Sequence, residues 1–202
     1  FTVQVQTEEV KSAGRKVSSL EEFLHIAKED FHEAYRIFTE RHFSLILSDQ
    51  SEKIRSLYAG MSQQPVTYQH LEEFLIAAGA KEKVTLSLNR EEAGFYDVSE
   101  SVQESLYIHR SGWGHLRADI EVNGDFLEAG KHVVTEEDFI GSTCEINYVI
   151  RQEKLGKGNQ YGEIIVKTPY QKLVYHVLAS RGTESAVNLD LLEKQYRISL
   201  MK

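Results

Sequence analysis

The chain has 202 residues, of which 41% are hydrophobic and 27% charged, a composition that indicates a folded globular protein of one or two domains. Its formal net charge is −8, and residues 1–150 hold 26 Asp and Glu against 14 Lys and Arg, whereas residues 151–202 hold 5 against 9. Because an acidic surface repels a phosphate backbone, we expect no nucleic-acid partner.

Three further properties of the sequence bear on the cellular location of the protein, on membrane insertion and on the length of the full protein. The single cysteine, Cys144, rules out an internal disulfide and every metal site built from several cysteines. A β-rich chain without disulfides favours a cytoplasmic location, although many secreted bacterial proteins also lack disulfides. No stretch has the roughly 18 apolar residues of a membrane span, so none is expected. Because residue 1 is Phe rather than Met, we expect the chain to be a piece of a longer protein.

The first element in chain order is the stretch FTVQVQ, which alternates apolar and polar residues as a half-buried strand does. A lone terminal strand is not stable by itself. It must therefore either add to a sheet elsewhere or be the last strand of a preceding domain, and we predict that residues 1–7 are the end of a preceding sandwich module.

Residues 18–80 have the three- and four-residue spacing of amphipathic helices. Ser19 and Glu22 form the pattern of a capping box, in which each side chain bonds to the other residue's backbone N–H. Apolar residues then recur from Leu20 to Phe38, which predicts one helix of about five turns.

Two more helices are predicted in the same segment. Asp49 and Glu52 open the second, SEKIRSLYAG, which Gly60 can end in a left-handed conformation. Thr67 precedes the third, YQHLEEFLIAAG, which stops at Gly79. The whole segment is therefore predicted to be a small helical bundle.

Residues 81–181 change to the two-residue period of β-strands. Turn chemistry is seen in NGD at 123–125 and in KGNQYG at 157–162, the second of which we interpret as a hairpin turn. About seven short strands in this length predict an antiparallel β-sandwich of immunoglobulin-like size. The predicted strands include KVTLSLN, ESLYIHR, HLRADIEVN, CEINYVI, YGEIIVKT and KLVYHVLA.

The last segment, NLDLLEKQYRISLMK, is again helical in its spacing. We predict a C-terminal helix within residues 184–202, which either packs on the earlier helices or begins a further helical segment. The fold class is therefore α+β, organised as several modules: a helical segment followed by an immunoglobulin-like antiparallel β-sandwich.

Two clusters of metal-ligand types have simpler interpretations. His25, Glu29 and His32 share one helical stripe, but Arg36 lies in line with them and opposes a cation, so we interpret the stripe as a solvated helix face. The three acids at 136–138 form a helical turn capped by Thr135, in preference to a Ca²⁺ site.

No catalytic constellation is recognisable in the sequence. LGKGNQYG lacks the Gly-Lys-Ser/Thr ending of a phosphate-binding loop and leads into a strand rather than a helix. Cys144 lies on the apolar side of its strand and is predicted to be an inert core thiol. We therefore predict no catalytic residue, no cofactor and no metal, and expect that the chain is not an enzyme.

The only tryptophan, Trp113, lies between two glycines in RSGWGHLRAD. Counting back along the predicted strand puts Trp113 on the polar side with His115, unless a glycine bulge reverses the alternation. With the bulge, Trp113 covers one end of the sandwich core; without it, Trp113 is exposed as a platform for a sugar or peptide. We favour packing over the platform.

The sandwich half resembles a known but uncharacterised family. WGHLRADIEVNGDFLE, TEEDFIGSTCEINYVI and KLGKGNQYGEIIVKTPYQ are similar to large multidomain bacterial proteins in which immunoglobulin-like sandwich modules alternate with helical segments. The resemblance implies modular architecture and brings no activity. Gly156 stands where a histidine is more usual, which argues against a ligand role for its loop. The matching positions are Asp138, Phe139, Gly141, Tyr148, Ile150, Leu155, Gly158, Asn159, Gly162 and Ile164.

The sequence supports two hypotheses about function. The first is a non-catalytic scaffold or interaction module that contacts a protein partner or other modules of the same chain. The second is a carbohydrate-binding or adhesive sandwich that uses Trp113, His115 and Tyr107 as its ligand surface.

Overall fold

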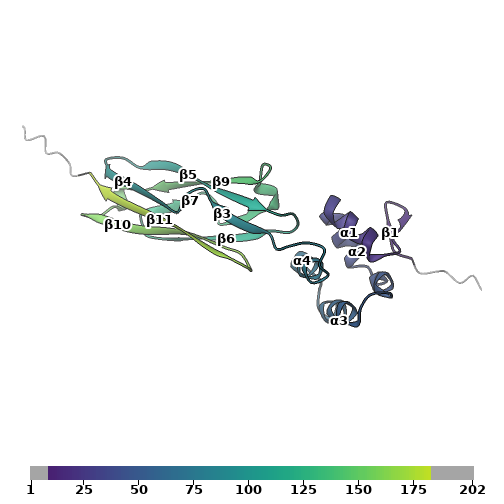
Figure 1. Ribbon diagram of the computed structural model, residues 1–202. Coiled ribbons are helices and arrows are strands. Elements are labelled where there is room, and N and C mark those ends of the chain that lie inside the picture. The colour runs from purple at the N-terminus through teal and green to yellow at the C-terminus, as the bar shows by residue number, and fades with distance from the viewer. Residues whose placement is uncertain (1–8, 183–202) are drawn as a thin grey trace, which may run out of the picture. The chain divides into compact units, whose positions relative to one another are not determined.

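The computed structural model describes residues 9–182 (Figure 1), so the strand predicted at 1–7 and the helix predicted at 184–202 lie outside the described residues. The chain divides into two compact units. The first runs to Thr85 and also includes Ser111–Leu116, and the second comprises Leu86–Arg110 and the chain from Arg117 onwards. The segment Ser111–Leu116, which the sequence interpretation assigned to the sandwich, therefore belongs to the helical unit.

The first unit consists of helices preceded by a small hairpin. The hairpin was not predicted; it turns at Ala13 and Gly14, both of which have positive φ, and Val17 N donates to Val10 O at 2.8 Å. Its elements are β1 (Lys11–Ser12), β2 (Arg15–Lys16), α1 (Leu20–Glu29), α2 (Phe31–Phe38), the 3₁₀ helix η1 (Phe43–Leu47), α3 (Glu52–Met61) and α4 (Tyr68–Ala77).

The prediction of a single long helix from Leu20 to Phe38 is wrong, because the helix is interrupted at Asp30. Asp30 has an extended backbone, and its N–H donates to Ile26 O at 2.7 Å, which closes α1. Its carboxylate accepts from Glu33 N at 2.9 Å, which opens α2. Aspartate is a favoured N-cap, and the apolar spacing continues through the break because both helices bury residues in one core.

The other helix ends differ slightly from the prediction. Ser51, rather than Asp49, caps α3, and the helix runs through Gly60 as far as Met61. Thr67 caps α4, and His70 completes a capping box, since its ring nitrogen accepts from Thr67 N at 3.2 Å. As predicted, Gly79 follows the end of α4, with φ of +73°.

Aromatic rings form the centre of the helical core. Phe43 packs edge-on against Phe23, with ring centroids 4.7 Å apart, and against Phe38 at 5.0 Å. Tyr58 and Phe74 close the cluster from α3 and α4. These contacts join α1, α2, α3 and α4, and the apolar burial that they provide stabilises the unit.

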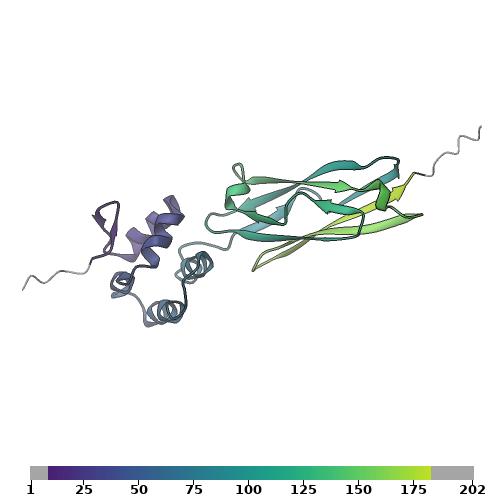
Figure 2. The same ribbon diagram turned by 180° about the vertical axis from the view of Figure 1, so that it is seen from behind.

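The second unit is a two-layer β-sandwich (Figures 1 and 2), which makes the chain α+β, as the sequence predicts. One sheet has the order β4-β11-β10-β6-β8 and the other the order β3-β5-β9-β7. The strands are β3 (Thr85–Leu88), β4 (Glu92–Val98), β5 (Val102–Ser111), β6 (Arg117–Asn123), β7 (Leu127–Ala129), β8 (Val133–Thr135), β9 (Thr143–Ile150), β10 (Asn159–Lys167) and β11 (Lys172–Arg181), with the 3₁₀ turns η2 (Glu136–Asp138) and η3 (Gln152–Lys154).

Two features of the sandwich correct the sequence interpretation. The sheets are not wholly antiparallel, because β4, which was not predicted, pairs with β11 in parallel. KGNQYG is not a hairpin turn, since β10 already begins at Asn159 and β9 and β10 belong to different sheets. The chain crosses between the layers there, and glycine favours both kinds of turn.

Candidate functional site

Trp113 packs against the core of the helical unit, where its side chain is half-buried. Gly112 and Gly114 both have positive φ, of 89° and 107°, so the residues around Trp113 form a loop rather than the start of a strand. β6 begins only at Arg117. The count of alternating positions therefore does not apply to Trp113, and the core that it contacts is the helical one rather than the sandwich core.

A buried ion pair lies beneath this loop. The ammonium of Lys81 donates to the carboxylate of Glu72, and each side chain is 1% exposed. The same carboxylate accepts from the backbone N–H of His115 at 3.1 Å, and the Lys81 nitrogen lies 4.9 Å from the centre of the Trp113 ring. Burial raises the pKa of the Glu72 carboxyl, although Lys81 opposes the shift.

Gly114 is required by this arrangement. A Cβ atom at this position would collide with Lys81 Nζ and with the Glu72 carboxylate. The positive φ of Gly114 is also one that other residues rarely adopt. The ion pair, the tryptophan ring and the two glycines therefore act together to hold the loop on the helices.

His115 belongs to a stack of rings from the same unit. Its ring lies 5.6 Å from the ring of Tyr68, which in turn stacks on Tyr35 at 3.9 Å. The Tyr35 hydroxyl donates to Val66 O at 2.8 Å. These ring contacts of His115 thus hold the loop in place.

The predicted stripe of His25, Glu29 and His32 is divided by the break at Asp30. His25 and Glu29 form an exposed pair at 3.3 Å on α1, while His32 Nδ1 lies 3.0 Å from the Tyr68 hydroxyl. Among residues 9–182, no group of three or more His, Cys, Asp or Glu side chains is placed to hold a metal ion.

Two other side-chain predictions are confirmed. Thr135 begins the turn η2, where its N–H donates to Asp138 Oδ2 at 2.8 Å, and Lys131 donates to the same carboxylate and lowers its pKa. Cys144 is buried in the sandwich core, and burial raises the pKa of its thiol. A thiol in this state is a poor nucleophile.

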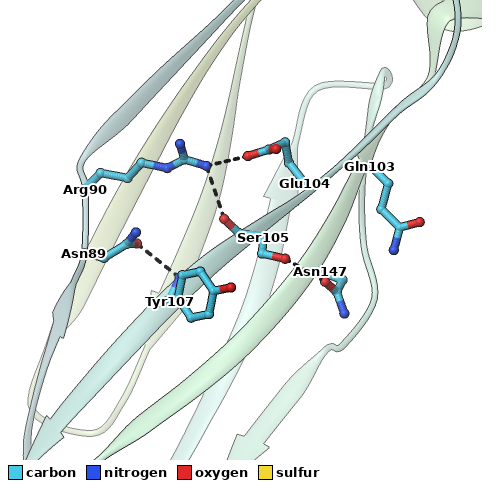
Figure 3. Close-up of a pocket in the computed structure, with 7 residues that line it drawn as sticks. All are labelled: Asn89, Arg90, Gln103, Glu104, Ser105, Tyr107 and Asn147. Carbon is cyan, nitrogen blue, oxygen red and sulfur yellow. Dashed lines mark hydrogen bonds and ion pairs between the residues drawn. The ribbon is translucent and has the colours of Figure 1, made fainter.

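Tyr107, the third predicted ligand residue, lies on β5 in the other unit, beside a polar groove of about 590 Å³. We call this the β5-edge groove. Figure 3 shows the side chains that line it, which come from the segment that follows β3, from β5 and from β9. Its lining residues are Asn89, Arg90, Gln103, Glu104, Ser105, Tyr107 and Asn147.

Asn89 and Arg90 bond to the backbone of β5 just beyond the end of β3, Asn89 through both its backbone and its side chain. Asn89 N donates to Tyr107 O at 3.0 Å, and Asn89 Oδ1 accepts from Tyr107 N at 3.1 Å. Where β3 has ended, Arg90 Nη2 donates to Ser105 O at 3.2 Å (Figure 3). Both backbone groups of Tyr107 and the carbonyl of Ser105 are therefore hydrogen-bonded without a further strand.

The charge of Arg90 is balanced within the groove. Its Nη2 atom donates to Glu104 Oε2 at 2.9 Å, and this bond raises the pKa of the guanidinium. The guanidinium also lies over the ring of Tyr175 at 5.7 Å. Beneath it, the hydroxyls of Tyr175 and Tyr148 share a buried hydrogen bond of 2.9 Å.

The outer face of the groove carries a hydrogen-bonded cluster. Ser105 Oγ lies 2.6 Å from Glu145 Oε1 and 2.9 Å from Asn147 Oδ1. The Tyr107 hydroxyl donates to the same Glu145 oxygen at 3.2 Å. Sequence reasoning missed all of these residues except Tyr107, because strand pairing brings them together from distant positions.

A second surface feature lies on the other sheet. Tyr161 on β10 is paired with Leu178 on β11, and Leu178 with Gly94 on β4. The ring of Tyr96 covers Gly94, since a Cβ there would lie 3.0 Å from it. Tyr96 and Tyr161 are 66% and 77% exposed. We call Tyr96, Leu178 and Tyr161 the aromatic row.

The aromatic row has an acidic border. In the next set of paired positions, His176 on β11 lies between Glu92 on β4 and Glu163 on β10. His176 Nδ1 is 3.4 Å from Glu163 Oε1. The row is therefore an exposed apolar strip beside two carboxylates.

Solved structures with limited similarity cover about half of the chain. They include the ASH/PapD-like domain of human CEP192 (7% identity, 48% of this chain and 84% of that one, TM-score 0.36) and WR4, a C. elegans MSP family member (6%, 47%, 97% and 0.37). A FixG-related protein from Vibrio parahaemolyticus is 10% identical, with 50% of this chain and 99% of that one covered and a TM-score of 0.36. Similarity at this level carries no information about function.

No curated protein matches the chain, and no helix within residues 9–182 is long and apolar enough to cross a membrane. One family model matches residues 1–202, the N-terminal model of a family of unknown function, DUF5717. This agrees with the resemblance to an uncharacterised family. The chain belongs to the DUF5717 family, whose N-terminal region it represents.

Proposed function

We propose that this chain is a non-catalytic protein-interaction module, and that the aromatic row is its contact surface. The observation that carries the proposal is the exposure of two tyrosine rings beside Leu178 on one sheet face. Tyrosine gives a large contact area at low entropic cost and is enriched in protein interfaces.

The acidic border defines the chemistry of the partner. Glu92 and Glu163 favour a protein surface in which basic residues surround an apolar centre. Such a surface belongs either to another protein or to another module of the same chain. The immunoglobulin-like sandwich is then one segment of a larger bacterial protein, with the helical unit as its neighbour in sequence.

The state of the reactive side chains supports a non-catalytic role. The Glu72 carboxylate is bound to Lys81 and to the backbone of His115. The Cys144 thiol is buried, with a raised pKa. Both side chains therefore stabilise the fold and are not exposed to a substrate.

Photo-crosslinking in cells of the source organism tests the proposal. A benzoylphenylalanine in place of Tyr161 is expected to crosslink a discrete protein, and the Tyr96→Ser change is expected to abolish that product. The matched control is the same probe at Tyr107, an exposed tyrosine of the other sheet that is 39% exposed. Equal crosslinking from both positions, or none from Tyr161, would contradict the proposal.

A further inference from the structure

The β5-edge groove lies on the opposite sheet from the aromatic row and has different chemistry. Its volume of about 590 Å³ is within the range of roughly 300–1,000 Å³ that small-molecule sites occupy. All but one of its lining side chains end in an amide, a hydroxyl, a carboxylate or a guanidinium without an aromatic ring. The exception is Tyr107, which supplies both a ring and a hydroxyl.

The hydrogen bonds of the groove argue against a peptide strand as its occupant. Strand addition needs free backbone N–H and C=O groups along a sheet edge. Here Asn89 already bonds to both backbone groups of Tyr107, and Arg90 bonds to the carbonyl of Ser105. An added strand would therefore have to displace three hydrogen bonds to β5, whereas a ligand bound by side chains would displace none of them.

The charges of the groove argue against an ionic ligand. Its lining has one cation and one anion, Arg90 and Glu104, and these two bind each other at 2.9 Å. The neighbouring carboxylate of Glu145 is held by Ser105 and Tyr107. An anion would meet Glu145 and a balanced guanidinium, and a cation would have to compete with Arg90, so a neutral ligand fits best.

The side-chain donors and acceptors of the groove that make no hydrogen bond within the protein match the hydroxyl groups of a sugar. Among the described residues, the Gln103 amide makes no hydrogen bond, and the amide nitrogens of Asn89 and Asn147 do not donate to the protein. A hydroxyl both donates and accepts, and so pairs with an amide that offers both functions. The Tyr107 ring provides the apolar face on which the C–H groups of a pyranose can stack.

We propose that the β5-edge groove binds a neutral carbohydrate, with Gln103, Asn147 and Asn89 as hydrogen-bonding residues and Tyr107 as the stacking residue. The proposal does not depend on a protein partner at the aromatic row, since the two surfaces lie on different sheets. If the carbohydrate proposal fails, the proposed protein contact at the aromatic row is still tested by its own experiment, and the reverse also holds.

The test is a titration of the ¹⁵N-labelled chain with neutral hexasaccharides of glucose, xylose, mannose and N-acetylglucosamine. At least one sugar is expected to shift amide resonances of β5 and β9 in the millimolar range. Tyr107→Ala and Asn147→Ala are expected to weaken that binding at least tenfold. Tyr161→Ala, the matched exposed tyrosine of the other sheet, is expected to leave it unchanged, and unchanged spectra elsewhere show that each variant folds.

Three results would overturn the proposal. The first is that none of these sugars shifts the β5 and β9 resonances, and the second is that binding survives both groove variants. The third is binding of an extended (Thr-Val)₃ peptide that Asn89→Ala strengthens, because that change frees the backbone of Tyr107 for a strand. That last result would assign the groove to peptide recognition.

Discussion

Glu72 on α4 and Lys81 just beyond it form an ion pair in which each side chain is 1% exposed. The carboxylate also binds the backbone of His115, and the ammonium faces the Trp113 ring. The pair therefore connects α4 to the loop Ser111–Leu116.

Removing one partner of the pair is expected to be far more costly than replacing both. Lys81→Met leaves a carboxylate buried without its cation, and such changes cost about 3–5 kcal/mol. The double change Glu72→Met with Lys81→Met removes both charges and is expected to cost much less. Urea unfolding of the two variants measures the difference. Equal destabilisation by the single and double changes would argue against a buried pair.

Gly114→Ala is expected to destabilise the chain more than Gly112→Ala. Both positions have positive φ, which costs about 1–3 kcal/mol for an ordinary residue. Only at Gly114 does the new methyl group also collide with the ion pair, because at Gly112 its nearest neighbour is Val84 Cα at 3.6 Å. Thermal unfolding compares them, and equal melting temperatures would mean that the loop does not lie on the pair.

Trp113→Ala is expected to lower the free energy of unfolding by about 2–3 kcal/mol, less than for a fully buried tryptophan because the ring is half-buried. Trp113→Phe keeps an aromatic face for Lys81 and is expected to lose less. Circular dichroism during urea unfolding gives both values. A Trp113→Ala variant as stable as the wild type would restore the view of Trp113 as an exposed ligand platform.

The contribution of Glu33 is expected to depend on pH. Hydrogen bonds from Arg36, and then from Ser12, lower the pKa of Glu33 from 4.5 to about 2. A carboxyl whose pKa is lowered by folding stabilises the protein above its unfolded pKa, and this stabilisation is lost as the pH falls towards 2.

The Glu33→Gln variant measures that contribution. It is expected to be about 0.5–1 kcal/mol less stable than the wild type at pH 7, a modest value because solvent screens the pair. The difference is expected to shrink between pH 4.5 and pH 2. Urea unfolding at several pH values provides the comparison, and a constant difference would contradict the assigned cause.

Periodicity predicted the classes of both units but not their details. The break at Asp30 was hidden because α1 and α2 bury residues in the same core. β4 was missed because EAGFYDV contains Glu, Ala, Gly and Asp, which are depleted in strands, and because its partner β11 lies about 80 residues away in the sequence.

The surfaces were harder to predict than the fold. The alternation around Trp113 was counted from His115, whereas the glycines delay the start of β6 to Arg117. The β5-edge groove joins residues from 89 to 147, and no spacing in the sequence shows which of them become neighbours. Only pairing of the strands brings Asn147 beside Ser105.

The affinity of the crosslinked partner for the purified chain tests the proposed function most directly. With Tyr96→Ser and Tyr161→Ser together, we expect the dissociation constant to rise at least tenfold, because both exposed rings of the aromatic row are removed. Tyr107→Ser is expected to leave it unchanged. An affinity that the double change does not alter would contradict the assignment of the aromatic row as an interaction surface.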